Sequence, residues 1–217
     1  MSAEPDAVEI RVVGALLEKQ RTTPEAYPLS INALRLACNQ STNRDPVVDF
    51  DERTVVAALE RLHRRGWTRM ASGAGSRSRK YRHLADRALD LGEPDLAVLC
   101  VLMLRGAQTL GELKQRTVRL HPLADMAAVE DVLDGLVGRE LVARIERQPG
   151  QKEQRYAQVL EGAPWRRASR PPIHGSRKPT ADGPPETAPG EDRLERLERE
   201  VAELRSEVAS LREQLGG

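Results

Sequence analysis

The amino-acid sequence predicts a mainly α-helical fold with small β-hairpins, and three observations lead to this prediction. Helical apolar spacing gives way to a glycine-rich hairpin pattern within the segment 51–83. The same succession of helix and hairpin patterns recurs after Glu93, and an apolar heptad follows near the C-terminus. From these patterns we predict four regions: two tandem winged-helix domains at 1–88 and 89–160, a disordered linker at 161–192 and a coiled-coil helix at 193–217.

The first unit holds three helical patterns and one hairpin. Apolar residues at three- and four-residue steps predict three helices: 8–20, 29–40 and 51–65. Asp49 and Glu52 have the spacing of a capping box before the third helix. Two strands are predicted after it, over 67–71 and 79–84, and the glycine- and serine-rich segment 72–78 suits a turn between them. A helix followed by such a hairpin is typical of a winged helix.

The second unit repeats this order. Apolar spacing predicts three more helices: 94–106, 109–117 and 126–139. Thr109 and Glu112 have capping-box spacing, and two strands are predicted around Pro149 and Gly150. Aligning the two units superposes three residue pairs: Leu59 with Leu133, Leu62 with Leu136, and Tyr81 with Tyr156. We interpret this match as an internal duplication of a winged-helix unit.

A strongly basic stretch lies in the first unit. From Arg61 to His83 there are eight lysines and arginines and no acid, although the net charge of the whole chain is only +1. A local excess of this kind creates a positive patch that attracts phosphates. With one arginine added from the third helix, these residues form the predicted nucleic-acid-binding set: Arg53, Arg61, Arg64, Arg65, Arg69, Arg77, Arg79, Lys80 and Arg82. The second hairpin mixes acids with bases, so the two units are expected to have different roles.

The polar turn at 39–46 is a second candidate site. Four of its side chains are candidates for contacts with phosphates or base edges: Asn39, Gln40, Asn43 and Arg44. In the alternative interpretation, the polar side chains of this turn satisfy exposed backbone groups at two helix ends. Asp49, Asp51 and Glu52 lie at the start of the third helix, where acids repel phosphate or, alternatively, only cap the helix.

The C-terminal quarter of the chain has a different composition. Residues 161–192 contain seven of the fourteen prolines, which predicts a disordered linker; its arginines either add non-specific attraction to nucleic acid or are simply solvated. Beyond it, seven apolar residues follow heptad spacing: Leu194, Leu197, Val201, Leu204, Val208, Leu211 and Leu215. Valine at a positions with leucine at d positions favours a parallel homodimeric coil. The alternative is an amphipathic helix that folds back on its own chain.

Signatures of enzyme chemistry are missing from the sequence. It has no glycine-rich phosphate loop, no nucleophile elbow and no paired-cysteine spacing, and its four histidines have no neighbour at ligand spacing. No enzymatic activity, metal or cofactor is therefore expected. Cys38 and Cys100 lie in apolar helical patterns, which indicates buried thiols. The chain shows neither a signal peptide nor a long apolar run, so we expect a cytoplasmic protein without membrane contact.

The segment from Leu16 to Val48, LLEKQRTTPEAYPLSINALRLACNQSTNRDPVV, is long and distinctive. With the helices and hairpins that follow it, the chain as far as Leu160 resembles the YceH-like family of uncharacterised bacterial proteins. The resemblance implies a cytosolic bacterial protein with two tandem winged-helix domains, and family members often end in a leucine-rich coil. It implies no established biochemical activity, because winged helices serve both DNA binding and protein contact.

Two functions are expected from these patterns. The first is a dimeric, double-stranded DNA-binding protein, plausible as a transcriptional regulator. Its third helix would enter the major groove, where Arg53 and Arg61 reach guanine edges and Ala57 permits close approach, while the wing holds phosphates. The second is an adaptor without specific DNA binding, in which the tandem winged helices contact protein partners. The second unit would then carry the partner site.

Overall fold

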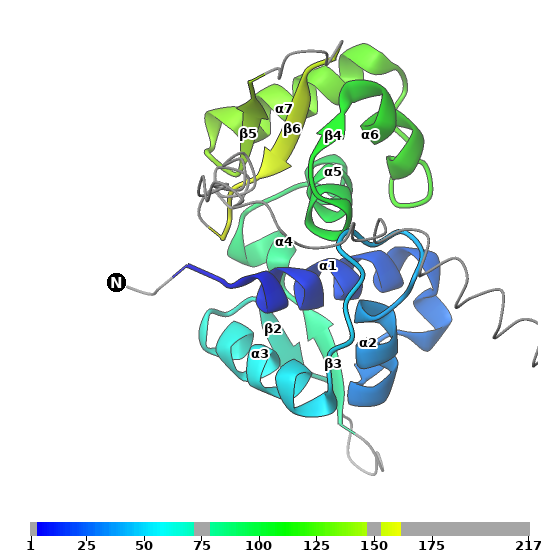
Figure 1. Cartoon of the computed structure of the whole chain (residues 1–217), viewed down its shortest axis with the longest axis vertical. Helices are drawn as coiled ribbons and strands as arrows, with labels where there is room; N and C mark the ends of the chain where they lie inside the picture. The colour runs from blue at the N-terminus through cyan, green and yellow to red at the C-terminus, as the bar shows by residue number, and fades with distance from the viewer. Residues whose placement is uncertain (1–3, 72–78, 147–152, 162–217) are drawn as a thin grey trace, which may run out of the picture. The chain divides into compact units, whose positions relative to one another are not determined.

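The computed structural model describes residues 4–71, 79–146 and 153–161 (Figure 1). Within these ranges the chain is mainly helical, with two small antiparallel sheets. Several predicted features lie outside the described residues: the tips of both hairpins, the linker beyond Glu161, and the coil at 193–217. The heptad residues and the predicted homodimer therefore stay predictions.

The first half contains three main helices around a three-stranded sheet. Its elements follow in this order: α1 (Ala7–Thr22), the short 3-10 helix η1 (Pro24–Ala26), β1 (Leu29–Ser30), α2 (Ile31–Cys38), α3 (Glu52–Arg64), β2 (Thr68–Met70), β3 (Lys80–His83) and α4 (Ala85–Ala88). The strand order in the sheet is β1-β3-β2, and both pairings are antiparallel. The last strand of the hairpin therefore lies between its partner and the short strand that precedes α2.

The second half repeats this arrangement with fewer elements. It comprises α5 (Glu93–Arg105), β4 (Gln108–Thr109), α6 (Leu110–Thr117), α7 (Met126–Gly138), β5 (Val142–Ile145) and β6 (Arg155–Gln158). Its sheet has the order β4-β6-β5, which is the order of the first sheet in equivalent strands. Helix, short strand, two helices and a hairpin, in that order twice, are compatible with a winged-helix-like class.

The structure confirms the predicted equivalence of Tyr81 and Tyr156. Tyr81 of β3 pairs with Leu29 of β1, and Tyr156 of β6 pairs with Gln108 of β4. Each tyrosine therefore lies at the point where the hairpin strand meets the short first strand of its own sheet. The aligned helix residues agree as well, because Leu59, Leu62, Leu133 and Leu136 are all buried.

Sequence periodicity located the six main helices to within about two residues, but it missed smaller elements and misplaced one cap. The two-residue strands β1 and β4 and the single turn of α4 are too short to produce a periodic pattern. The predicted capping box of Asp49 and Glu52 is wrong. The N-cap of α3 is Asp51, whose carboxylate accepts from the Thr54 N–H at 2.8 Å, while Asp49 accepts instead from the Asn39 side chain.

Helices α1 and α5 pack against each other and join the two halves (Figure 1). Both helices are buried around much of their circumference, and most of their buried apolar residues belong to one continuous hydrophobic cluster. Gly14 makes the close approach possible, because a Cβ there would lie 3.0 Å from the Leu104 side chain. The predicted boundary at 88/89 falls between α4 and α5, and the division into two domains stays a prediction.

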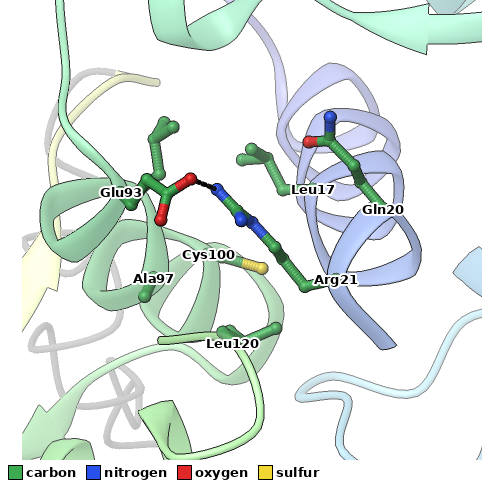
Figure 2. Close-up of a pocket in the computed structure, with 8 residues that line it drawn as sticks. Leu17, Gln20, Arg21, Glu93, Ala97, Cys100 and Leu120 are labelled. Carbon is green, nitrogen blue, oxygen red and sulfur yellow. Dashed lines mark hydrogen bonds and ion pairs between the residues drawn. The ribbon is translucent and has the colours of Figure 1, made fainter. Parts of the chain in front are cut away.

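A polar pair flanks this helix contact. Arg21 of α1 donates to Glu93 at the start of α5 (Figure 2). The N–O distance is 2.7 Å. The hollow that these residues line with Leu17 and Cys100 holds only about 10 Å³, roughly the space of one water molecule. This place is a packed interface and has no room for a ligand. The ion pair is largely exposed, so apolar contact supplies most of the stabilisation.

Candidate nucleic-acid interface

Helix α3 has a buried face and a basic exposed face. Val55, Ala58, Leu59 and Leu62 point into the core, as their spacing predicts. The opposite side presents an exposed stripe at helical spacing: Arg53, Ala57, Glu60 and Arg64. The stripe has a small residue near its centre and an arginine toward each end, and Glu60 is the acid within it.

The hairpin that follows α3 continues the positive surface. In the antiparallel register Arg69 lies opposite Arg82, and Arg79 precedes β3 with its side chain exposed. Like charges directly opposite one another on a sheet repel, so an anion close to this pair would relieve the repulsion. The Arg82 Nε is buried and has no hydrogen-bond partner among the described residues. Lys80 is half-buried beside it, and Arg77 lies outside the described part of the hairpin.

Two of the predicted nucleic-acid contacts are engaged inside the protein. Arg61 donates to Asp6 at 2.6 Å and forms an ion pair with Glu9 at 3.2 Å, and Arg65 donates to the other oxygen of Glu9 at 3.0 Å. Glu9 is almost fully buried, at 1% exposure, so these two guanidinium groups balance a carboxylate that water cannot reach. A base or phosphate would have to compete with Glu9 for both arginines.

The sequence contains a capping motif that predicts part of this network, although helical periodicity does not reveal it. Asp6 and Glu9 have the D-x-x-E spacing of a capping box, and the structure shows both bonds of that motif at the start of α1. Glu9 therefore serves two purposes, since it caps α1 and also holds Arg61 of α3 and Arg65, the C-cap of the same helix. The capping pattern predicts the first role, and only the packing of α1 against α3 produces the second.

The polar turn at 39–46 is held together by its own side chains. The Arg44 side chain is fully buried and donates to both oxygens of Glu18, to the Ala37 carbonyl and to Gln40. Asn39 forms two hydrogen bonds with the backbone of Phe50, at 2.9 Å each. These contacts support the interpretation in which this turn satisfies backbone groups at helix ends. Asn43 accepts from Arg105, at the junction with the second half.

The acids at the start of α3 are partly explained by capping. Asp51 accepts the hydrogen bonds of Thr54, which hold the pKa of its carboxyl below its ordinary value. A carboxylate at this helix end is stabilised by the helix dipole and satisfies a free backbone N–H. Glu52 is exposed in the first turn. The leading end of α3 therefore keeps a negative charge on the surface, whereas Arg64 places positive charge at the other end.

Helix α7, the counterpart of α3 in the second half, has the opposite charge. Three of its exposed residues are acids, Glu130, Asp131 and Asp134, and the helix contains no lysine or arginine. Arg144 of the following strand is paired with Asp134. Phosphate would be repelled from this face. Among the residues that the structure describes, a basic helix surface next to a basic hairpin therefore occurs only in the first half.

His83, at the end of β3, is a structural residue. Its side chain is buried, its Nδ1 accepts from the Ala85 N–H at 3.2 Å, and its Nε2 contacts the Gln20 side-chain oxygen. This arrangement assigns the proton to Nε2 of a neutral ring. Burial lowers the pKa of His83 to about 4, although the nearby Asp86 acts in the other direction. The ring is therefore uncharged at neutral pH and adds nothing to the basic surface.

Neither a metal centre nor a reactive thiol is found in the described part of the chain. The described residues hold no group of three or more histidine, cysteine or acidic side chains that could bind a metal. Cys38 and Cys100 are buried, as the apolar patterns indicated. Burial raises the pKa of Cys38 to about 12 and raises that of Cys100 as well, so both stay protonated thiols at neutral pH. Among the described helices, none combines the length and apolar character that a membrane span requires.

The described residues thus form a mainly helical protein with two small antiparallel sheets. Helix α3 and the hairpin that follows it present a basic surface. It belongs to the family described as "Protein of unknown function, DUF480", whose model matches residues 6–151. This result confirms the expectation of an uncharacterised bacterial family.

Relatives in several bacteria cover about three quarters of the chain. A UPF0502 protein of Geotalea uraniireducens (strain Rf4) is 54% identical over 159 residues, which are 72% of each chain. One from Geobacter metallireducens is 53% identical over 161 residues, 73% of each chain. One from Solibacter usitatus is 49% identical over 162 residues, 75% of this chain and 78% of the relative.

Proposed function

We propose that this protein binds double-stranded DNA through the first of two tandem winged-helix domains. The observation that carries the proposal is the positive surface of α3 and the following hairpin, where Arg53, Arg64, Arg69 and Arg79 are exposed and Lys80 and Arg82 are half-buried. We name it the basic face and define it by six residues: Arg53, Arg64, Arg69, Arg79, Lys80 and Arg82. Lysines and arginines gathered on one helix and an adjacent hairpin are the electrostatic signature of a nucleic-acid-binding module.

The two parts of the basic face suit different contacts. The exposed stripe of α3 has Ala57 near its centre, which permits close approach to a groove, and Arg53 is the arginine nearer the leading end. The hairpin arginines suit sequence-independent contacts with phosphates, which position a protein on the duplex. Arg61 and Arg65 are left out of the interface because Glu9 engages both.

Dimerisation through the C-terminal heptad completes the proposal. The predicted coil at 193–217 would pair two chains in parallel, so two basic faces would act together on one duplex. Two-fold symmetric proteins of this kind recognise palindromic sites, because each half-site meets the same surface. A role in transcriptional regulation would follow from such recognition.

The experiment is a fluorescence-anisotropy titration of the full chain with a random-sequence duplex at several salt concentrations. If about six phosphates are neutralised, affinity should fall roughly a thousandfold between ~50 and ~200 mM salt. The test variant is Arg69→Glu with Arg79→Glu. The matched control is Arg87→Glu with Arg119→Glu, which makes the same charge change at two exposed arginines outside the basic face.

We expect the test variant to lose binding and to flatten the salt dependence, and the control to keep most of the affinity. An affinity that does not depend on salt would contradict the proposal. Equal losses in the two variants would also contradict it, because only net charge would then matter.

A second candidate function is a protein adaptor, which the acidic face of α7 favours. Glu130, Asp131 and Asp134 are exposed on one helix whose counterpart in the first half is basic. Such a face suits a partner with a positively charged surface. Absence of DNA binding, together with a stable complex that Asp131→Lys disrupts, would favour the adaptor.

A further inference from the structure

A polar pocket lies where the turn at 43–45 meets the second half of the fold. It has a volume of about 260 Å³, and four arginines line it: Arg44, Arg105, Arg116 and Arg155. Its chemistry differs from that of the basic face, because Arg105, Arg116 and Arg155 meet at one hollow from α5, α6 and β6, while the Arg44 side chain is buried against Glu18 beside it. A concave site with converging polar groups is the usual form of a small-molecule site.

The carboxylates nearby do not balance all of these arginines. Glu112 forms an ion pair with Arg116 at 3.3 Å and accepts a hydrogen bond from Arg155 at 3.2 Å, so one acid serves two bases. Glu18 balances Arg44 from outside the pocket. Asp45 lines the pocket and also attracts Arg11. The side-chain partner of Arg105 is the neutral amide of Asn43.

The field inside the pocket is therefore positive. Burial lowers the pKa of Arg105, and the positive charges of Arg116 and Arg44 lower it further, while Glu18 acts in the opposite direction. An anion in the pocket would relieve this repulsion, as phosphate does where several arginines converge.

Gln108 supplies an independent sign of a missing partner. Its side chain is 3% exposed, and its Nε2 donates to the carbonyls of Arg105 at 2.9 Å and Ala107 at 3.0 Å. These two bonds fix the orientation of the amide, because both partners are acceptors. The Oε1 is buried and accepts no hydrogen bond from any described residue, although Gln108 lines the pocket. Buried acceptors are nearly always satisfied, so this oxygen marks a position for a donor.

We propose that the pocket binds a small phosphate-bearing molecule. The phosphoryl oxygens would accept from Arg105, Arg116 and Arg155. A hydroxyl of the ligand would donate to the Gln108 Oε1 after the side chains that cover this buried oxygen move aside. This combination distinguishes the ligand from a DNA backbone, since a phosphodiester is an acceptor without a hydroxyl. It also distinguishes phosphate from sulfate. At neutral pH hydrogen phosphate keeps one hydroxyl, whereas sulfate has the same charge and none.

The test is isothermal titration calorimetry of the full chain with inorganic phosphate and, in parallel, with sulfate at equal ionic strength. We expect phosphate to bind roughly tenfold more tightly than sulfate, the effect of about 1.4 kcal/mol from one hydrogen bond. Arg116→Gln should weaken phosphate binding by a similar factor. Arg119→Gln, two residues beyond α6 and outside the pocket, should leave it unchanged.

Gln108→Met tests the hydroxyl contact and should remove the preference for phosphate over sulfate. Since this variant loses two internal hydrogen bonds, its folding is checked by circular dichroism, and Arg116→Gln provides the independent test. Three results would each overturn the proposal: no phosphate binding to the wild-type chain, equal binding of phosphate and sulfate, or phosphate binding that Arg116→Gln leaves intact. Displacement of phosphate by a short duplex would also overturn it, because the pocket would then be part of the DNA surface.

Discussion

Replacement of Arg44 tests whether the polar turn at 39–46 is structural. The side chain of Arg44 is fully buried, and its three nitrogens donate to four residues: Ala37, Glu18, Asn43 and Gln40. The strongest of these contacts is bidentate, with N–O distances of 2.6 and 3.1 Å to Glu18. Through these bonds Arg44 ties the turn to the end of α2 and to α1.

The magnitude follows from what Arg44→Ala leaves behind. Loss of one partner of a buried ion pair costs about 3–5 kcal/mol, because the other charge stays unpaired. Glu18 keeps 16% side-chain exposure and therefore some hydration, so we expect the lower end, about 3 kcal/mol. For a protein of this length that corresponds to a decrease of roughly 6–12 °C in Tm. Arg44→Lys keeps the charge but loses the planar fork, and should cost about 1–2 kcal/mol.

The assay is urea unfolding followed by circular dichroism, with DNA affinity measured on the same variants under folding conditions. Arg53→Ala is the matched control, because its side chain is exposed and its removal should change stability by less than about 0.5 kcal/mol. The two variants should then have different effects: Arg44→Ala should lower stability, and Arg53→Ala should weaken DNA binding. If Arg44→Ala unfolded within about 1 kcal/mol of wild type and yet lost DNA affinity, the structural role would be refuted and the turn would be a DNA contact.

Three further outcomes are expected from groups in the core. His83 has a folded-state pKa of about 4, below its ordinary 6.5, so the unfolded chain binds more protons between these values and stability is lost as pH falls through that window. The loss of stability by pH 4 should be roughly 2–4 kcal/mol. His83→Gln should flatten the dependence of stability on pH, measured by urea unfolding across that range. An unchanged dependence in this variant would contradict the role given to His83. Cys38 and Cys100 should react with a thiol reagent only as fast as the chain opens, so rapid labelling of both in native buffer would refute their burial. Gly14→Val should destabilise the protein by about 1–3 kcal/mol, because a side chain there meets Leu104; a wild-type Tm would show that α1 and α5 can separate without cost.

The exposed residues of α3 illustrate how far local patterns reach. The periodicity of Val55, Ala58, Leu59 and Leu62 defines the buried side of the helix, and this prediction is confirmed. The same periodicity places Arg61 toward solvent, where it looks available for a base. Asp6 and Glu9 lie more than fifty residues earlier and take up that side chain. No local pattern contains this information.

The set of candidate site residues also differs between sequence and structure, because contacts between distant segments decide which side chains are buried. Hydrogen bonding and burial assign Arg44 to the interior, although its sequence neighbours are turn residues of the kind that usually face solvent. The pocket next to it was not predicted, because Arg105, Arg116 and Arg155 are spread over fifty residues and belong to three elements. Gln108 lies in a strand of two residues, too short for any periodic signal.

The sequence by itself determined the six main helices, the two hairpins, the repeated order of these elements and the basic stretch from Arg61 to His83. These features depend on the spacing and composition of residues that are close together in the sequence. The tertiary structure alone decided which charges stay available. It assigned Arg61 and Arg65 to Glu9, buried Arg44 against Glu18, and left Arg53, Arg64 and Arg69 exposed. The physical reason is that a buried carboxylate must be neutralised by whichever cation the packing of distant helices brings to it.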